Sequence, residues 1–270
     1  MNRLKVSIVQ MFIEKDKIKN LEKANNFIKK SVKDEANMVV LPEMFLCPYI
    51  ESNFPIYAEK EGDFSFSSLS EMAKKNNVYL VAGSVPEKDD EGHIYNTSYV
   101  FDPNGNKIAK HRKAHLFDID IKGGQHFKES DTLDAGNKAT VFDTKYGKIG
   151  LCICYDFRFP ELSRLMVDKG AMAIIVPAAF NMTTGPAHWE LLFRCRAVDN
   201  QVYTIGCAPA RDCNSSYISY GNSIAVSPYG QVLVNMNEKE GFSICDLDFE
   251  YVNKIRDELP LLAQRRLDIY

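Results

Sequence analysis

The stretch that decides the fold runs Ile149-Gly150-Leu151-Cys152-Ile153-Cys154-Tyr155-Asp156-Phe157-Arg158-Phe159-Pro160-Glu161. Its first half alternates in side-chain direction, which predicts a strand over 148–154 with Cys152 and Cys154 on one face. A helix is expected over 159–169, because a proline stands near its start and a glycine follows its end. The chain therefore passes from a buried strand through a short turn into a helix.

Strands and helices alternate on both sides of this stretch. Before it, the hydrophobic pattern predicts helices over 18–32 and 68–76 and strands over 5–9, 38–41, 78–82 and 96–101. After it, the pattern predicts a helix over 187–200 and strands over 172–176, 202–207, 223–226, 232–235 and 243–247. Helices that cover only one face of a sheet require a second sheet behind it. Since no linker or repeat divides the chain, we expect one α/β domain, residues 1–270, with two sheets between outer helices.

The composition excludes several classes of function. Hydrophobic residues make up 45% of the 270 residues, and 33 Lys and Arg against 36 Asp and Glu give a net charge of -3. This balance argues against a broad nucleic-acid-binding face. The longest apolar run covers about ten residues, 171–180, whereas a membrane-spanning helix needs about twenty. With no signal-peptide pattern in residues 1–10, we expect a cytoplasmic protein with neither a nucleic-acid nor a membrane partner.

Seven cysteines, an odd number at irregular spacing, predict reduced thiols and no disulfide framework. Cys152 and Cys154 form a C-x-C pair with no second pair at zinc spacing, so a structural zinc site is not expected. Cys154 ends the predicted strand at the turn, where backbone N–H groups lower a thiol pKa and hold an oxyanion. Cys154 is therefore a candidate nucleophile, with a small buried side chain as the alternative, and Cys152 is expected to be structural.

A carboxylate and a lysine are candidates to assist this thiol. Glu43 follows the apolar strand 38–41, where desolvation raises a carboxyl pKa and suits a general base. The alternative is a loop glutamate in water. Lys113 lies in the basic segment 110–117, which is typical of a solvated surface unless an acid is buried beside it. Further possible bases, which the spacing does not separate, are His111, His115 and His188.

Taken together, these motifs resemble the carbon–nitrogen hydrolase (nitrilase) superfamily, whose hallmark is a Glu-Lys-Cys triad in that chain order. The matching motifs are Leu41-Pro42-Glu43, His111-Arg112-Lys113, Cys154-Tyr155-Asp156 and Arg158-Phe159-Pro160-Glu161. Within the superfamily the chain looks most like omega-amidases, on residues 113–120, 127–130, 180–190 and 196–201. Deaminated-glutathione amidases share residues 185–190 of these. Cys47 departs from the pattern, which has a serine there.

The resemblance implies a four-layer α-β-β-α sandwich with the site at one end, which dimerises into a larger layered assembly. It implies no metal and no organic cofactor. It assigns Cys154 as the nucleophile, Glu43 as the base and Lys113 as the cation that binds the oxyanion. Glu129 would support the lysine.

The resemblance also implies a substrate site. The backbone N–H of Tyr155 would share the oxyanion. Arg158 suits a bidentate contact with a substrate carboxylate, with a surface ion pair to Glu161 as the alternative. In related amidases the counterparts of Phe180 and Thr184 contact a 2-oxo acid end.

The expected function is hydrolysis of the terminal amide of short 2-oxo dicarboxylic acid monoamides, such as 2-oxoglutaramate and 2-oxosuccinamate, through a cysteine thioester. The partners expected are this small-molecule amide and a second copy in a homodimer. Activity on deaminated glutathione or on an N-carbamoyl compound is the alternative with the same chemistry. Two other classes stay open: a thiol redox or metal-binding module that uses Cys152 and Cys154, and a non-catalytic interaction protein. Cysteines one residue apart on one strand face are poorly placed for an unstrained disulfide.

Overall fold

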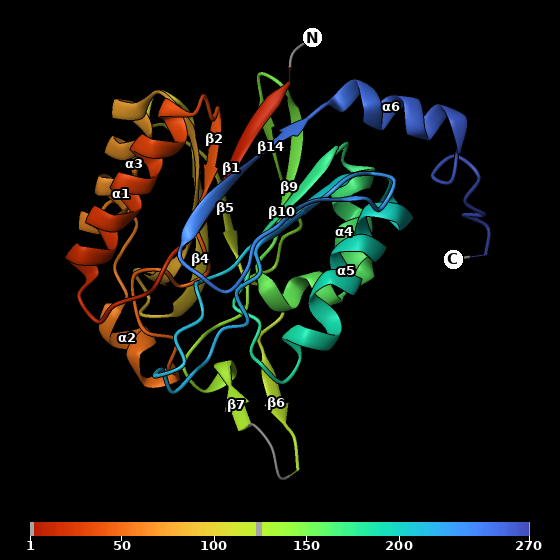
Figure 1. Cartoon of the computed structure of the whole chain (residues 1–270). Coiled ribbons are helices and arrows are strands. Elements are labelled where there is room, and N and C mark those ends of the chain that lie inside the picture. The colour runs from red at the N-terminus through yellow and green to blue at the C-terminus, as the bar shows by residue number, and fades with distance from the viewer. Residues whose placement is uncertain (1–2, 123–125, 270) are drawn as a thin grey trace.

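Two six-stranded sheets stacked face to face form the centre of the computed structural model, which describes residues 3–122 and 126–269 (Figure 1). The first sheet has the order β14 (Gly241–Leu247), β1 (Leu4–Gln10), β2 (Met38–Val40), β3 (Tyr79–Lys88), β4 (Ile94–Phe101) and β5 (Lys107–Arg112). The second has the order β13 (Val232–Asn235), β12 (Ile224–Val226), β11 (Tyr203–Cys207), β10 (Ala173–Pro177), β9 (Gly147–Leu151) and β8 (Thr140–Thr144). In both sheets the central strands pair in parallel and the outer strands antiparallel.

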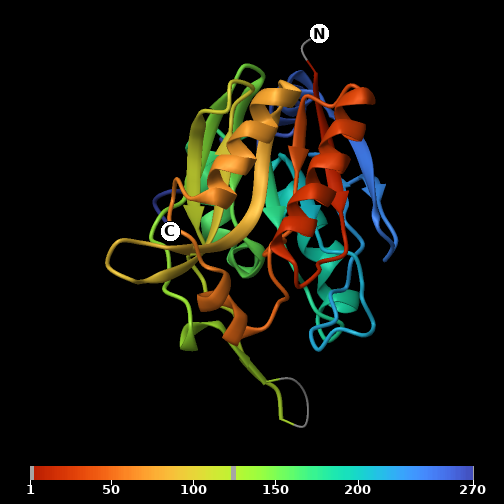
Figure 2. The same cartoon turned by 90° about the vertical axis from the view of Figure 1, so that its left-hand side faces the viewer.

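Each sheet is covered on its outer face by two helices (Figures 1 and 2). The first sheet is covered by α1 (Lys17–Lys33) and α3 (Phe64–Asn76), and the second by α4 (Pro160–Asp168) and α5 (Gly185–Asn200). Helix α1 begins close to the expected residue because the side chain of Asp16 accepts from the free N–H groups of Ile18 and Lys19. The expected α-β-β-α sandwich is confirmed.

Three layers of apolar side chains hold this sandwich together. Val6 and Ile8 of β1 lie between the two sheets, whereas Val9 packs beneath the helices of the first sheet. In the second sheet, Ile149 and Leu151 of β9 also lie between the sheets. Because both faces of each sheet are covered, the central strands are apolar on both sides.

The parallel strands of both sheets end at the pole of the molecule opposite the N-terminus (Figure 1). Glu43 lies three residues past the end of β2, and Cys154 lies three residues past the end of β9. A short hairpin, β6 (Asp118–Asp120) and β7 (His126–Lys128), projects at the same pole. The architecture therefore gathers residues from several strand ends in one place, where α/β proteins form their sites.

The predicted strand over 148–154 is three residues too long. Strand β9 ends at Leu151, and Cys154 begins a 3-10 turn, Cys154–Arg158, with a left-handed φ of 47°. The backbone N–H of Ile153 donates to the carboxylate of Asp156 at 3.0 Å and does not extend the strand ladder. Cys154 therefore stands on a turn and not on the strand face that the alternation predicts.

Several elements are not among those that the sequence pattern predicts. Strands β5 and β8 lie at the sheet edges, β6 and β7 are three residues each, and α2 (Phe54–Tyr57) is a single turn. Helix α6 (Phe249–Glu258) projects near the N-terminal pole (Figure 1). None of the helices in the described part of the chain is long and apolar enough to cross a membrane.

Candidate active site

Four buried side chains with reactive or ionisable groups meet at the strand ends. Glu43 follows β2 and Lys113 follows β5. Glu129 begins a 3-10 turn after β7, and Cys154 begins the turn after β9. Cys154 is 5% exposed, Glu43 1% and the other two 0%. The structure thus brings together, from four separate segments, the residues that the sequence analysis placed in one catalytic group.

Lys113 is the cation at the centre of this group. Its Nζ lies 2.8 Å from Oε1 of Glu129 and 3.1 Å from Oε1 of Glu43. Burial lowers the pKa of Lys113, but the Glu129 and Glu43 carboxylates raise it more, so the pKa lies above its usual range. Burial raises the pKa of Glu129 although Lys113 opposes this shift. Within the described residues, two of the three N–H groups of the Lys113 ammonium donate to these carboxylates. The third N–H is available to a developing oxyanion.

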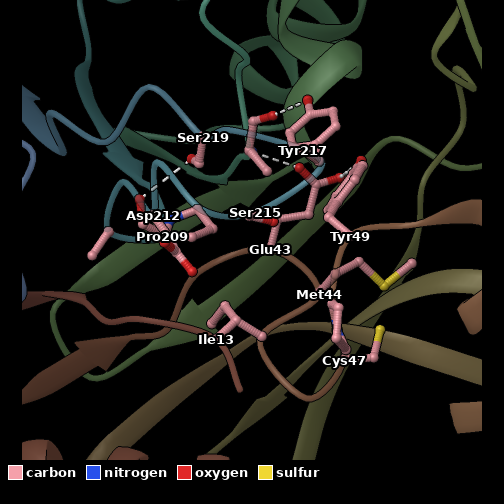
Figure 3. Close-up of a pocket in the computed structure, with 13 residues that line it drawn as sticks. Ile13, Glu43, Met44, Cys47, Tyr49, Pro209, Asp212, Ser215, Tyr217 and Ser219 are labelled. Atoms are coloured by element: carbon pink, nitrogen blue, oxygen red, sulfur yellow. Dashed lines mark hydrogen bonds between the residues drawn. The ribbon is translucent and has the colours of Figure 1, made fainter. Parts of the chain in front are cut away.

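Further donors hold the two carboxylates in place. The hydroxyl of Tyr49 lies 2.7 Å from Oε1 of Glu129. It also lies 3.1 Å from Oε1 of Glu43 (Figure 3). Asn96 Nδ2 donates to Oε1 of Glu43 at 2.8 Å, and the Ala179 N–H donates to its Oε2 at 2.6 Å. The sequence analysis missed Tyr49 and Asn96, because no local motif marks a hydrogen-bond partner that lies on another segment.

Cys154 combines a strained backbone with a thiol that resists ionisation. A left-handed φ, here 47°, costs a residue other than glycine on the order of 1–3 kcal/mol. Burial raises the pKa of the thiol well above its usual range, and Glu43 raises it further, while Lys113 opposes the shift. The thiol therefore needs a base before it can attack, and Glu43 is the carboxylate that acts on it most strongly.

The carboxylate of Asp156 ties the cysteine turn to the lysine segment, and we call these contacts the Asp156 clasp. Its Oδ1 accepts from the N–H groups of Ala114 (3.1 Å) and His115 (2.8 Å) and lies 2.8 Å from Nδ1 of His115. Its Oδ2 lies 2.9 Å from Nε2 of His111 and 3.0 Å from the N of Ile153. Burial raises the pKa of Asp156, but the hydrogen bonds from His111 and His115 lower it more, so it stays well below its usual range.

The three histidines considered as bases have other partners. His111 and His115 belong to the Asp156 clasp, and His188 Nδ1 lies 3.0 Å from Nη1 of Arg158. The sequence alone gives Asp156 no role, because no local sequence pattern marks a carboxylate as buried. Its contacts identify it as a positioning residue that fixes Cys154 relative to Lys113.

The expected substrate residues lie beside Cys154. The guanidinium of Arg158 lies 4.5 Å from the ring centroid of Phe180 and 5.8 Å from that of Tyr155. Burial lowers the pKa of Arg158. No carboxylate in the described part of the chain forms an ion pair with Arg158, so the alternative pairing with Glu161 is absent. Apart from the contact of Nη1 with His188, the guanidinium therefore has N–H groups available for a carboxylate from outside the chain.

Two other residues from the sequence analysis lie close by. The N–H and hydroxyl of Thr184, the residue before α5, donate to Oδ1 of Asn181 at 3.0 and 3.2 Å. Cys152 is fully buried in the apolar layer beneath α4 and α5. Among the described residues, no three His, Cys, Asp or Glu side chains are grouped to hold a metal ion.

We expect Asp156→Asn to lower the free energy of unfolding by about 3–5 kcal/mol, because it removes the charge of a buried carboxylate that makes five contacts. The folded-state pKa of Asp156 is depressed, so its contribution is present above the unfolded pKa and is lost as the pH falls through the folded pKa. Urea unfolding at neutral and acid pH should therefore show a difference between wild type and variant that shrinks in acid. Asp90→Asn, at a 92% exposed side chain, is the matched control. Equal losses in the two variants would contradict the clasp.

The comparisons with known proteins agree with this geometry. The carbon–nitrogen hydrolase family model matches residues 5–257. The chain is 47% identical over 270 residues to the omega-amidase NIT2 of Xenopus tropicalis, covering 100% of this chain and 98% of that one. It is 48% identical over 276 residues to the omega-amidase NIT3 of Saccharomyces cerevisiae, covering 99% and 95%. The crystal structure of Saccharomyces cerevisiae Nit3, described as a member of branch 10 of the nitrilase superfamily, matches with a TM-score of 0.91 and 45% identity, covering 98% of this chain and 97% of that one.

The resemblance that the matching motifs indicate is thus confirmed over nearly the whole length of the chain, in sequence and in fold. This protein belongs to the carbon–nitrogen hydrolase family.

Proposed function

We propose that this protein is an omega-amidase that hydrolyses the terminal amide of short 2-oxo dicarboxylic acid monoamides, such as 2-oxoglutaramate and 2-oxosuccinamate, to the acid and ammonia. The observation that carries the proposal is an arginine fork, Arg158, with no carboxylate partner in the described chain, beside a buried Glu43, Lys113 and Cys154 group. The likeness to proteins named omega-amidases over the full chain supports it.

The first half of the reaction forms a thioester. Glu43 takes the proton of the Cys154 thiol, and the thiolate attacks the amide carbonyl carbon. The oxyanion is stabilised by the remaining N–H of Lys113 and by the backbone N–H of Tyr155. Glu43 then donates its proton to the leaving ammonia. Glu129 keeps Lys113 charged and oriented throughout, since its Oε1 lies 2.8 Å from Nζ.

The second half releases the acid. Water gives a proton to Glu43 and attacks the thioester carbonyl, and the C–S bond to Cys154 breaks. One carboxylate thus serves as base, then acid, then base again, which suits a group held by four donors and not free to rotate. The donors that orient Glu43 therefore contribute to both halves of the reaction.

Substrate choice depends on the groups around Arg158. The edge of its guanidinium pairs bidentately with the substrate carboxylate, while the Phe180 ring packs against one face of the guanidinium. Tyr155 borders the same space. Thr184, whose hydroxyl donates to Asn181, contacts the 2-oxo acid end. This arrangement favours short substrates with a carboxylate at a fixed distance from the amide.

We also propose a cytoplasmic homodimer. Exposed apolar side chains gather on α5 and the turn before β13, namely Leu191, Val198 and Tyr229, a pattern typical of an interface. All seven cysteines are free thiols, which suits a reducing compartment. Sedimentation velocity that finds only a monomer would overturn the homodimer.

The test of the proposed function is ammonia release from 2-oxoglutaramate by the purified protein. We expect rapid release that disappears in Cys154→Ala, because the thioester cannot form without the thiol. Cys195→Ala, at an exposed cysteine, is the matched control and should behave as wild type. Negligible release from 2-oxoglutaramate with rapid release from deaminated glutathione would assign the sister activity instead.

Arg158→Lys tests the carboxylate anchor. Lysine keeps the charge but cannot donate two parallel N–H bonds to one carboxylate. We therefore expect KM for 2-oxoglutaramate to rise roughly 10- to 100-fold with little change in kcat. The rate with an amide that lacks a carboxylate, such as butyramide, should not change. Arg194→Lys, at an exposed arginine of α5, is the matched control. An unchanged KM in Arg158→Lys would remove Arg158 from the substrate site.

A further inference from the structure

A small cavity reaches Glu43 without including the nucleophile or the arginine fork. It lies where the segments after β1 and β2 meet the loop between β11 and β12, and we call it the Glu43 cavity (Figure 3). It is lined by Glu43, Tyr49, Asp212, Ser215, Tyr217 and Ser219, with apolar residues such as Ile13 completing the wall. Its volume is about 50 Å³, and within the described residues its lining excludes Cys154, Arg158 and Phe180.

Two tyrosines line this cavity on the side of the catalytic group. The Tyr49 and Tyr217 rings pack with centroids 4.5 Å apart, and both rings line the cavity. Tyr217 donates to the carbonyl oxygen of Ala179, whose N–H holds Oε2 of Glu43. Both tyrosines are also close enough to Cys154 for its charge to affect their pKa values. Glu43 is thus the one member of the catalytic group that also lines the cavity.

We propose that the Glu43 cavity binds the water that hydrolyses the thioester on Cys154, and that this water reaches Glu43 by a route separate from the substrate. The inference rests on the proposed function, because only a thioester needs such a water.

The size and lining of the cavity select water over the substrate. One water needs about 10–15 Å³ and two to four polar partners, so a cavity of about 50 Å³ holds more than one. The hydroxyls of Ser215 and Ser219 and the carboxylates of Asp212 and Glu43 supply such partners. Ligand pockets are about 300–1,000 Å³, far larger than this cavity.

The order of the reaction explains why a separate route is useful. After ammonia has left, the acyl chain fills the space between Cys154 and Arg158. Glu43, which must activate the water, is only 1% exposed. Water from the Glu43 cavity meets the base first: its proton passes to Glu43, its oxygen bonds to the thioester carbon and the C–S bond breaks. The released thiolate then takes the proton back from Glu43.

Filling the cavity tests this inference. Ser215 is half-buried in the lining, whereas its neighbour Ser216 is exposed and does not line the cavity. We expect Ser215→Phe to slow thioester hydrolysis at least about tenfold, and Ser216→Phe to leave it unchanged. Rapid quenching followed by intact-protein mass spectrometry measures the lifetime of the acylated Cys154. If Ser215→Phe does not fold, Ile13→Phe replaces it as the test, because Ile13 lines the same cavity from the segment after β1.

Steady-state kinetics separate this role from others. Since kcat/KM covers only the steps up to ammonia release, Ser215→Phe should lower kcat and KM together and keep kcat/KM within about twofold. A fall in kcat/KM without acylated Cys154 would identify the cavity as the substrate entrance and overturn the inference. Kinetics equal to those of Ser216→Phe would also overturn it. Wild-type protein that neither releases ammonia nor becomes acylated would instead refute the proposed function.

Discussion

The buried charge of Lys113 is the constraint on which the rest of the site depends. Removing an ammonium from water costs several kcal/mol unless carboxylates compensate it. Its two carboxylates come from the segments after β2 and β7, while Lys113 itself follows β5. These strand ends must therefore converge on one point, and the apolar layers beneath them keep them there. Stability and chemistry share the same three side chains.

The Asp156 clasp is the second buried charge, and it links the two sheets. His111 belongs to β5 of the first sheet, and Ile153 follows β9 of the second. By holding both, the Asp156 carboxylate fixes the position of Cys154 against Lys113. The same contacts keep Cys154 in its left-handed conformation, a strain that local backbone preferences would release.

Glu43 belongs to the catalytic group and also lines the Glu43 cavity. Toward Cys154 the walls are aromatic rings and the Arg158 fork, which suit an anionic organic substrate. In the Glu43 cavity, small hydroxyls and Asp212 stand among the Tyr49 and Tyr217 rings and apolar side chains, and these polar groups suit water. In the proposed mechanism Glu43 is the base in both acylation and hydrolysis, and the proposed water route lets it act from two sides. The four donors on Glu43 hold it in that position.

The sequence by itself determined the order of the central strands and of the helices that cover the sheets, the layered α/β class, and the motifs around Glu43, Lys113 and Cys154. These features follow from side-chain periodicity, turn residues and motif order, all of which are local. The strand predicted over 148–154 was wrong for its last three residues, since the observed strand ends at Leu151. The N–H of Ile153 donates to Asp156 instead of to the sheet, and the alternation of side chains gives no sign of this hydrogen bond.

Only the tertiary structure decided which groups surround the chemistry. Tyr49, Asn96 and the histidines of the Asp156 clasp carry no motif, and they meet their partners only when the sheets pair and stack. The strain at Cys154, the direction of each pKa shift and the cavity beside Glu43 arise in the same way. Burial and distance between remote segments set these properties, and neither quantity exists until the chain has folded.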